Sequence, residues 1–465
     1  MDVRHDAASL YRFVDSVCSG CELTGNYPAY LEANKKFIDY VLELGIATKA
    51  YLRSFPDKIE RTTAIDYNLT RQELWLLRSS WEALHRRLKP ATAADTLHLP
   101  FPLIRALVNR FREIDHFKAT QFVVIHTELL NYLQVNAGHV RGTADNIASI
   151  VGPRKFDRNL GMIGIPYSQS ESLFLNCLIS HEFGHYAFSE REVATALAPD
   201  LRSALNASFA GVTSLTPNLG ALISNLVAEW AEELFCDLFA VRIVGPAFCY
   251  AWIEIQDLPN ALDHSGRSFH PPAVAEDAKF TSTHPANLYR LQQHVASLEE
   301  LGWWDEIAGY STHYVRLLAL AKAFPRSGFK VPIVGFQRYE SNILDALSKL
   351  MLAIRRAVNN SVGHIESGVE EYHALRGTLD KYLVRGIVPS SVIVAKGQVP
   401  RHPSPLTVLN AAYSFYLTEL HHLIEGIEDQ RPLWVTHREK WARKVETWAM
   451  KAIDDYLLVN NSKGA

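Results

Sequence analysis

The spacing of apolar residues predicts a chain that is mainly helical, with a short β-rich stretch in its first half. From Arg71 to Leu88, apolar side chains recur three and four positions apart, which is typical of an amphipathic helix that ends before Pro90. The segment from Leu103 to Ile114 has a similar pattern. Beyond about residue 286 the pattern is again mostly helical, apart from a Pro- and Ser-rich interruption from about Val388 to Pro405.

Two short segments have strand character instead. Residues Gln121–His126 (QFVVIH) are apolar and rich in β-branched side chains, which favours a buried strand. Residues Gly161–Tyr167 (GMIGIPY) predict a second short strand. Its Pro166 lacks a backbone N–H and therefore suits a sheet edge or a strand end.

Two strongly apolar helices follow this β-rich stretch. The first is expected from about Leu173 to Phe188, with Ser170 or Ser172 as its N-cap. The second is expected from about Leu219 to Val244, because Gly245-Pro246 is a standard stop signal. These two helices carry the chemistry discussed below.

Composition and charge exclude several classes of protein. Apolar residues make up 48% of the 465-residue chain, which is ordinary for a globular protein with a sizeable core. The net charge of −3 gives no electrostatic signal for nucleic acid. The sequence has neither an apolar signal segment at its start nor an apolar run of membrane-spanning length, so a cytoplasmic protein without a membrane span is expected.

The cysteines do not predict a disulfide framework. There are five, an odd and small number, which fits a reducing compartment. Cys18 and Cys21 form a CxxC pair, but a zinc ribbon needs a second pair and the sequence has none. The pair is therefore interpreted as structural.

The motif that carries chemistry is His181-Glu182-Phe-Gly-His185, an HExxH sequence in the first apolar helix. Residues four apart lie on one face of a helix, one turn apart, so His181 and His185 can reach the same metal ion. Glu182 lies beside the first histidine, where it can contact an activated water without binding the metal. The alternative is a buried helix whose two histidines are ordinary core residues.

A catalytic zinc ion usually takes three protein ligands, so a third ligand is expected elsewhere. On the second apolar helix, Glu233 and Asp237 are four residues apart and share a face. We expect Glu233 to bind the metal and Asp237 to accept the free N–H of a ligand histidine. Glu229 and Glu232 are competing candidates for the third ligand.

These residues together resemble the gluzincin metallopeptidases, whose pattern is HExxH followed by ExxxD on a second helix. A third element, Thr283-His284-Pro285 followed by Arg290, resembles a segment of the gluzincin branch that contains the CAAX prenyl peptidases. The resemblance covers residues 173–291. It implies that His181, His185 and Glu233 bind one zinc ion per chain and that Asp237 supports His181. It also implies that His284 and Arg290 contact the substrate.

The resemblance also implies a fold. We expect an α+β, predominantly helical chain with a zincin-like core, a small sheet and two active-site helices. In this interpretation residues 1–117 form an N-terminal helical region, 118–300 the core, and 301–465 a C-terminal helical region. The segment from Gly161 to Pro166 resembles the edge strand on which gluzincins hold an extended peptide.

The expected activity is zinc-dependent hydrolysis of peptide bonds in a peptide or protein substrate. Zinc would activate a water, Glu182 would act as general base, and His284 or Arg290 would stabilise the oxyanion. One alternative is a non-catalytic zinc-binding regulatory or scaffold protein built on the same domain. Another is a helical protein in which HExxH occurs by chance, which predicts no bound metal.

Overall fold

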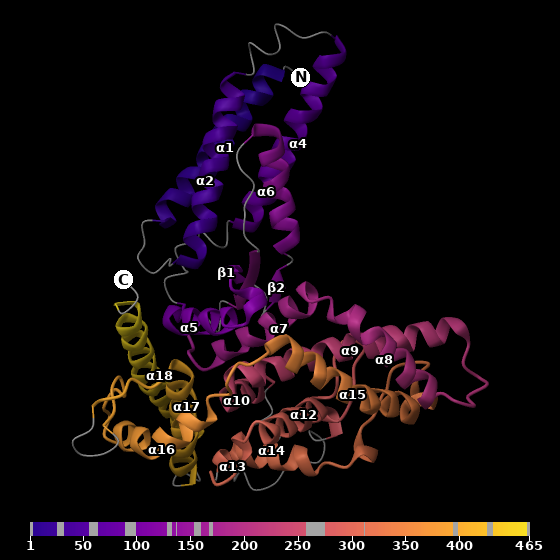
Figure 1. Cartoon of the computed structure of the whole chain (residues 1–465), viewed down its shortest axis with the longest axis vertical. Helices are drawn as coiled ribbons and strands as arrows, with labels where there is room; N and C mark the ends of the chain where they lie inside the picture. The colour runs from indigo at the N-terminus through magenta and orange to yellow at the C-terminus, as the bar shows by residue number, and fades with distance from the viewer. Residues whose placement is uncertain are drawn as a thin grey trace. The chain divides into compact units, whose positions relative to one another are not determined.

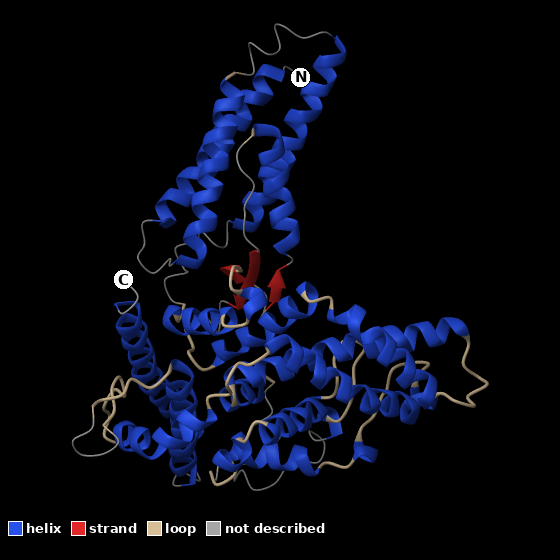
Figure 2. Cartoon of the chain, in the orientation of Figure 1, coloured by secondary structure: helices blue, strands red, loops and turns tan. Residues whose placement is uncertain are grey.

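The structure is a computed structural model, and it is mostly helical with one small sheet (Figures 1 and 2). This confirms the predominantly helical α+β class. The described residues are 3–25, 32–54, 64–88, 99–127, 133–135, 137–152, 160–166, 171–256, 275–310, 312–393, 399–425 and 431–462. Among the helices of these residues, none has both the length and the apolar character that crossing a membrane requires.

The chain divides into two compact units that do not follow the three expected regions. The first unit combines Met1–Phe101 with His116–Glu171, and the second combines Pro102–Asp115 with Ser172–Ala465. The strands therefore group with the N-terminal helices, not with the HExxH helix. The reason is packing: β1 lies against α2 and β3 lies against α6, all within the first unit.

The described residues of the N-terminal unit form four long helices and the sheet. The helices are α1 (Val3–Gly25), α2 (Glu32–Arg53), α4 (Ala64–Leu88) and α6 (Ala137–Val151). The strands are β1 (Gln121–Thr127), β2 (Leu133–Val135) and β3 (Leu160–Pro166). Strands β1 and β3 confirm the two segments with strand character, whereas β2 was not predicted.

The sheet has the order β1-β3-β2, so β3 is its middle strand. It pairs in parallel with β1 along its whole length and antiparallel with β2 from Met162 to Gly164. The expectation that residues 161–166 form an edge strand for a substrate is therefore wrong. Pro166 is instead the last residue of the strand, where its missing N–H is tolerated.

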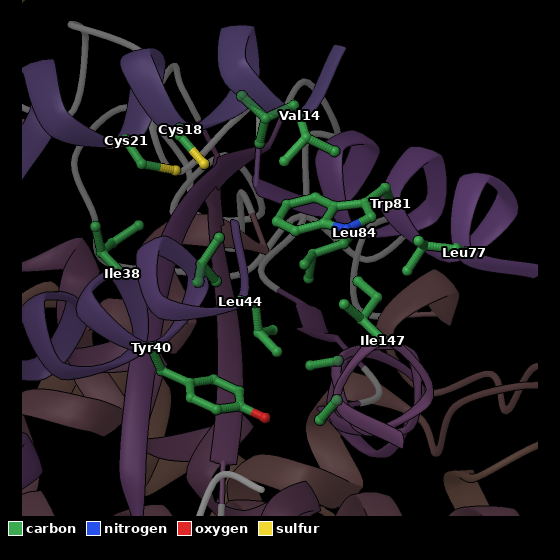
Figure 3. Close-up of a cluster of buried hydrophobic side chains, with 14 of the residues drawn as sticks. Val14, Cys18, Cys21, Ile38, Tyr40, Leu44, Leu77, Trp81, Leu84 and Ile147 are labelled. Carbon is green, nitrogen blue, oxygen red and sulfur yellow. The ribbon is translucent and has the colours of Figure 1, made fainter. Parts of the chain in front are cut away.

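Apolar side chains from these elements form one buried cluster, which we call the N-terminal cluster (Figure 3). Cys18 and Cys21 lie in it together with Trp81 and Leu84, and both thiols are free. Burial raises the pKa of both thiols, that of Cys21 to about 12. The CxxC pair thus contributes to the core as a small apolar group.

The second unit is built from helices joined by loops, and its described residues also contain two isolated β-bridges, Lys279–Lys330 and Val392–Arg401. It contains α5 (Phe101–Arg112), which begins at the boundary, η4 (Leu175–Leu178), α7 (Ile179–Glu190), α8 (Val193–Ser208), α9 (Pro217–Val244), α10 (Pro246–Ile255), α12 (Asn287–Glu300), α13 (Trp303–Ile307), α14 (His313–Ala323), α15 (Glu340–Val362), α16 (Val369–Val384), α17 (Pro405–Glu425) and α18 (Arg431–Ser462). Helix α9 packs against α7, α12 and α15.

Local signals explain where the two central helices begin and end. Thr216 caps α9 through its hydroxyl, and Gly245 with Pro246 separates it from α10. Before α7, the Ser172 hydroxyl accepts a hydrogen bond from the Leu175 N–H. The Glu446 carboxylate of α18 accepts from both the Ser172 hydroxyl and the Phe174 N–H. The C-terminal helix therefore holds the segment that leads into α7.

Candidate metal centre

Helix α7 presents the two histidines of HEFGH side by side. Their ring centroids are 4.9 Å apart and their planes are nearly perpendicular. Both side chains are mostly buried, with 13% of His181 and 19% of His185 exposed. The one-turn spacing thus brings two imidazoles to one place near the surface, as expected.

A close helix contact brings α9 against this pair. Gly184 has no side chain, and a Cβ built on it would lie only 2.7 Å from the Cα of Cys236. Any larger residue at position 184 would force the two backbones apart. The contact therefore sets the distance between the histidines and the acidic residues of α9.

Glu233 on α9 faces both rings. Its Oε2 lies 3.6 Å from Nε2 of His181, and its Oε1 lies 3.5 Å from Nε2 of His185. Each carboxylate oxygen of Glu233 thus lies near the Nε2 atom of one histidine. The side chain is 15% exposed, so the three groups form a partly buried polar cluster.

The opposite ring nitrogens contact two other acids. The Nδ1 of His185 lies within hydrogen-bonding distance of Glu232 Oε1, at 2.9 Å. The Nδ1 of His181 is 3.0 Å from Asp237 Oδ1, at ion-pair distance but without the alignment of a hydrogen bond. A carboxylate behind each Nδ1 favours the tautomer that leaves Nε2 free to bind a metal.

A cysteine also lies at this place. His181, His185 and Cys236 each offer a ligand atom, and the three atoms lie within 4.8 Å of one another, so the group is a possible metal site. Cys236 is fully buried. Burial raises the pKa of its thiol well above the usual value, and the neighbouring acids Glu233, Glu232, Asp237 and Glu182 raise it further. This environment opposes the thiolate that metal binding needs.

Asp237 is the centre of a buried charged network. It is completely buried, and the Arg290 guanidinium binds it in a bidentate manner, with Nε–Oδ2 and Nη2–Oδ1 distances of 2.6 and 2.7 Å. His294, also on α12, places its Nε2 3.1 Å from Asp237 Oδ2. Burial alone would raise the pKa of Asp237, but Arg290 and His294 hold it well below its usual range.

Charged groups on α7 and α9 shift one another's pKa values. Burial works to lower the pKa of His181, yet Asp237 and Glu233 raise it to about 10. Burial works to raise the pKa of Glu233, yet His181 and Arg290 lower it to about 2. His181 is therefore protonated at neutral pH when no metal is bound, and a metal ion must displace that proton.

The remaining predicted residues lie around this centre. Glu182 is buried on α7, next to His181. His284 is 54% exposed, with its Nε2 3.9 Å from Glu233 Oε2 and its Nδ1 2.8 Å from the Thr283 hydroxyl. Arg290 is buried and also reaches Glu233 Oε2, at 3.4 Å. It therefore lies inside the network instead of facing the surface where a substrate would bind.

The same geometry distinguishes Glu233 from Glu229 and Glu232, the other two candidates for the third ligand. Among the described residues, the two histidines form ion pairs with Glu232, Glu233 and Asp237, while Glu229 is exposed. Glu232 contacts Nδ1 and not Nε2, so it is placed as a partner of His185.

The sequence did not predict the position of Glu232, His294 or Cys236. Arg290 and His294 are four residues apart on α12, a spacing that could have suggested a shared partner.

Comparisons of the chain with protein-family models, with curated proteins and with solved structures found no match.

Proposed function

We propose that this chain is a zinc-dependent metallopeptidase in which His181, His185 and Glu233 bind the metal. The observation that carries the proposal is the meeting of two imidazole Nε2 atoms with the two oxygens of one carboxylate, at 3.6 and 3.5 Å. Two histidines and one acid are a common catalytic zinc set, and they leave a coordination position open. The same residues carry the resemblance to gluzincins.

The charges around the site favour a divalent cation. When a bound metal replaces the proton of His181, Glu232, Glu233 and Asp237 contribute three negative charges and Arg290 one positive charge, which leaves a net charge of −2. Much of this charge is buried, where an uncompensated ion is costly. A zinc ion bound here would supply Lewis-acid chemistry, polarising a peptide carbonyl and acidifying water.

Glu182 is the proposed general base. It follows His181 on α7 and is buried, and its charge is close enough to Cys236 to raise the pKa of that thiol. In this role it takes a proton from the attacking water and passes it to the leaving amine. Replacement by glutamine keeps the shape of the side chain but removes this ability.

His284 is the proposed substrate-side donor. Its ring is half exposed and close to Glu233, so a carbonyl bound beside the metal would come within its reach. If the Thr283 hydroxyl donates to Nδ1, the neutral ring carries its proton on Nε2, which then faces the site. Arg290 receives a different role from the one expected: because it is clamped to Asp237, we assign it to holding the acids in place.

Two measurements test the proposal. The first is zinc per chain by elemental analysis, for which we expect one in the parent protein and a large loss in His185→Ala. The second is digestion of a broad peptide library with and without a chelator, comparing the parent with Glu182→Gln. We expect Glu182→Gln to keep its zinc and to lose roughly a hundredfold or more in rate.

The possible results separate the alternatives. A parent protein without stoichiometric zinc would contradict the proposal and would favour a helical protein with a chance HExxH. Bound zinc without any chelator-sensitive cleavage would favour a non-catalytic zinc-binding protein. Equal cleavage by the parent and Glu182→Gln would show that the assigned base is wrong.

A further inference from the structure

His294 is a buried polar residue that the proposed mechanism does not use. It is completely buried on α12, one turn after Arg290. Its ring lies edge-on to two aromatic side chains of α10, with centroid distances of 5.4 Å to Phe248 and 5.3 Å to Trp252. Apolar neighbours of this kind would pack equally well against a phenylalanine, so packing alone does not explain a histidine here.

The contacts of Asp237 explain it better. Each oxygen of this carboxylate has two contacts: Oδ1 meets His181 Nδ1 and Arg290 Nη2, and Oδ2 meets Arg290 Nε and His294 Nε2. A rotation of the carboxylate would break contacts on both oxygens. His294 and Arg290 therefore fix the direction in which Oδ1 points, and Oδ1 points at His181.

We propose that His294 is a positioning residue for the metal centre, acting through Asp237 on the orientation of the His181 ring. The inference rests on the proposed zinc site. His294 Nε2 lies 3.1 Å from Asp237 Oδ2, at ion-pair distance but without the alignment of a hydrogen bond. Through this contact His294 keeps Oδ1 behind His181 Nδ1, so that His181 Nε2 faces Glu233.

The protonation of His294 agrees with this role. Burial lowers its pKa from the ordinary value, although Asp237 opposes the shift. The ring is then neutral at pH 7 and can carry its single proton on Nε2, facing the carboxylate. A neutral donor orients Asp237 without removing the negative charge that supports His181.

The test compares two replacements of His294 in the full chain. His294→Phe keeps an aromatic ring between Phe248 and Trp252 but removes the N–H, whereas His294→Gln keeps an N–H donor. We expect His294→Phe to weaken zinc binding about 10- to 100-fold, as loss of a residue behind a metal ligand typically does. We expect His294→Gln to bind zinc within about threefold of the parent, a smaller loss than the one expected for His294→Phe.

A spectroscopic readout separates positioning from general destabilisation. The visible absorption bands of Co²⁺ bound in place of zinc report on ligand geometry, so they should shift in His294→Phe and return in His294→Gln. Leu291→Ala on the same helix is the control, because Leu291 is fully buried and apolar. It should lower the melting temperature and leave both the zinc affinity and the Co²⁺ bands unchanged.

The outcomes distinguish this inference from the proposed function. If the parent binds one zinc and His294→Phe binds it equally tightly with unchanged Co²⁺ bands, the positioning role is wrong and the metal site stands. If His294→Phe does not fold, His294→Leu tests the same loss of the N–H. A parent that binds no zinc would overturn both proposals.

Discussion

The two units of the chain bury very different groups. The N-terminal cluster is almost entirely apolar, and one of its few polar contacts is a chain in which Trp81 donates to the Thr48 hydroxyl and Thr48 donates to the Leu44 carbonyl. The C-terminal unit instead buries a carboxylate, a guanidinium and an imidazole together, at Asp237, Arg290 and His294.

The difference separates a region that stabilises the fold from the region to which we assign the proposed chemistry. Apolar burial stabilises a fold directly, whereas the desolvation of buried ions often cancels the energy of their attraction. A chain selected only for stability could fill the space around Asp237 with apolar side chains. The charged network is therefore best explained by what it holds in place, the two histidines and Glu233.

The largest expected effect concerns the third ligand. Glu233→Ala should weaken zinc binding by roughly a thousandfold, because one of three anchoring groups is lost. Cys236→Ala, only three residues away, should bind zinc within about threefold of the parent, since its buried thiol is hard to ionise. Chelator competition measures both affinities. The opposite ranking would assign the third ligand to Cys236.

The next effect compares the two buried regions directly. Asp237→Asn removes the bidentate charge partner of buried Arg290 and leaves it with Glu233 Oε2, 3.4 Å away, which should cost about 3–5 kcal/mol of unfolding free energy. Leu84→Ala in the N-terminal cluster should cost about 2–5 kcal/mol by opening a cavity.

Of Asp237→Asn and Leu84→Ala, only Asp237→Asn should change the zinc affinity. Denaturant unfolding gives the stabilities, and zinc titration of the folded protein gives the affinities. Asp237→Asn should bind zinc more weakly, while Leu84→Ala should bind it normally. A normal zinc affinity in Asp237→Asn would remove the functional explanation of the charged network.

A smaller effect depends on pH and involves Glu446. Burial raises the pKa of this carboxyl to about 7, although the Phe174 N–H and the Ser172 hydroxyl lower it. A raised pKa means that its contribution to stability is full below the ordinary carboxyl pKa and is lost as pH rises through about 7. The corresponding loss is at most roughly 3 kcal/mol.

Glu446→Gln should therefore flatten the fall in stability between about pH 4.5 and pH 7 relative to the parent. Denaturant unfolding at several pH values measures the difference between the two proteins. Glu276→Gln removes an equal charge from a largely exposed position and serves as the control. Identical pH profiles for Glu446→Gln and the parent would count against the raised pKa.

The smallest effect belongs to the apolar region. Thr48→Val keeps the shape of the side chain but leaves the buried Trp81 N–H without its acceptor, which should cost about 1–2 kcal/mol. Zinc binding should not change. A loss of zinc in this variant would mean that the two regions are not functionally separate.

The sequence predicted the elements of the site better than their surroundings. Helices α7 and α9 were found because both lie in long apolar runs, and α9 also ends at a clear stop signal, Gly245-Pro246. Glu233 was chosen because it shares a face with Asp237. The sequence did not predict that Glu232 contacts His185 or where His294 lies. Both depend on how α7, α9 and α12 pack against one another, and the periodicity of a single helix does not predict that packing.

The sheet was harder to predict for a similar reason. Strand β2 has only three residues, too few for a pattern, and without it β3 could be taken for an edge. The compact units differ from the expected regions because packing joins residues 116–171 to the N-terminal helices, across the expected division at residue 118.

Gly184 shows that the middle residues of an HExxH motif are not always free to vary. The two middle letters of the motif are written as free, yet here the second admits only the smallest residue, because the Cα of Cys236 occupies the space. In a sequence with HExxH but a bulky residue at that position, a second helix could not pack as close to the motif helix as α9 packs to α7 here. The size of that one residue is therefore a simple filter for separating chance occurrences from sites of this geometry.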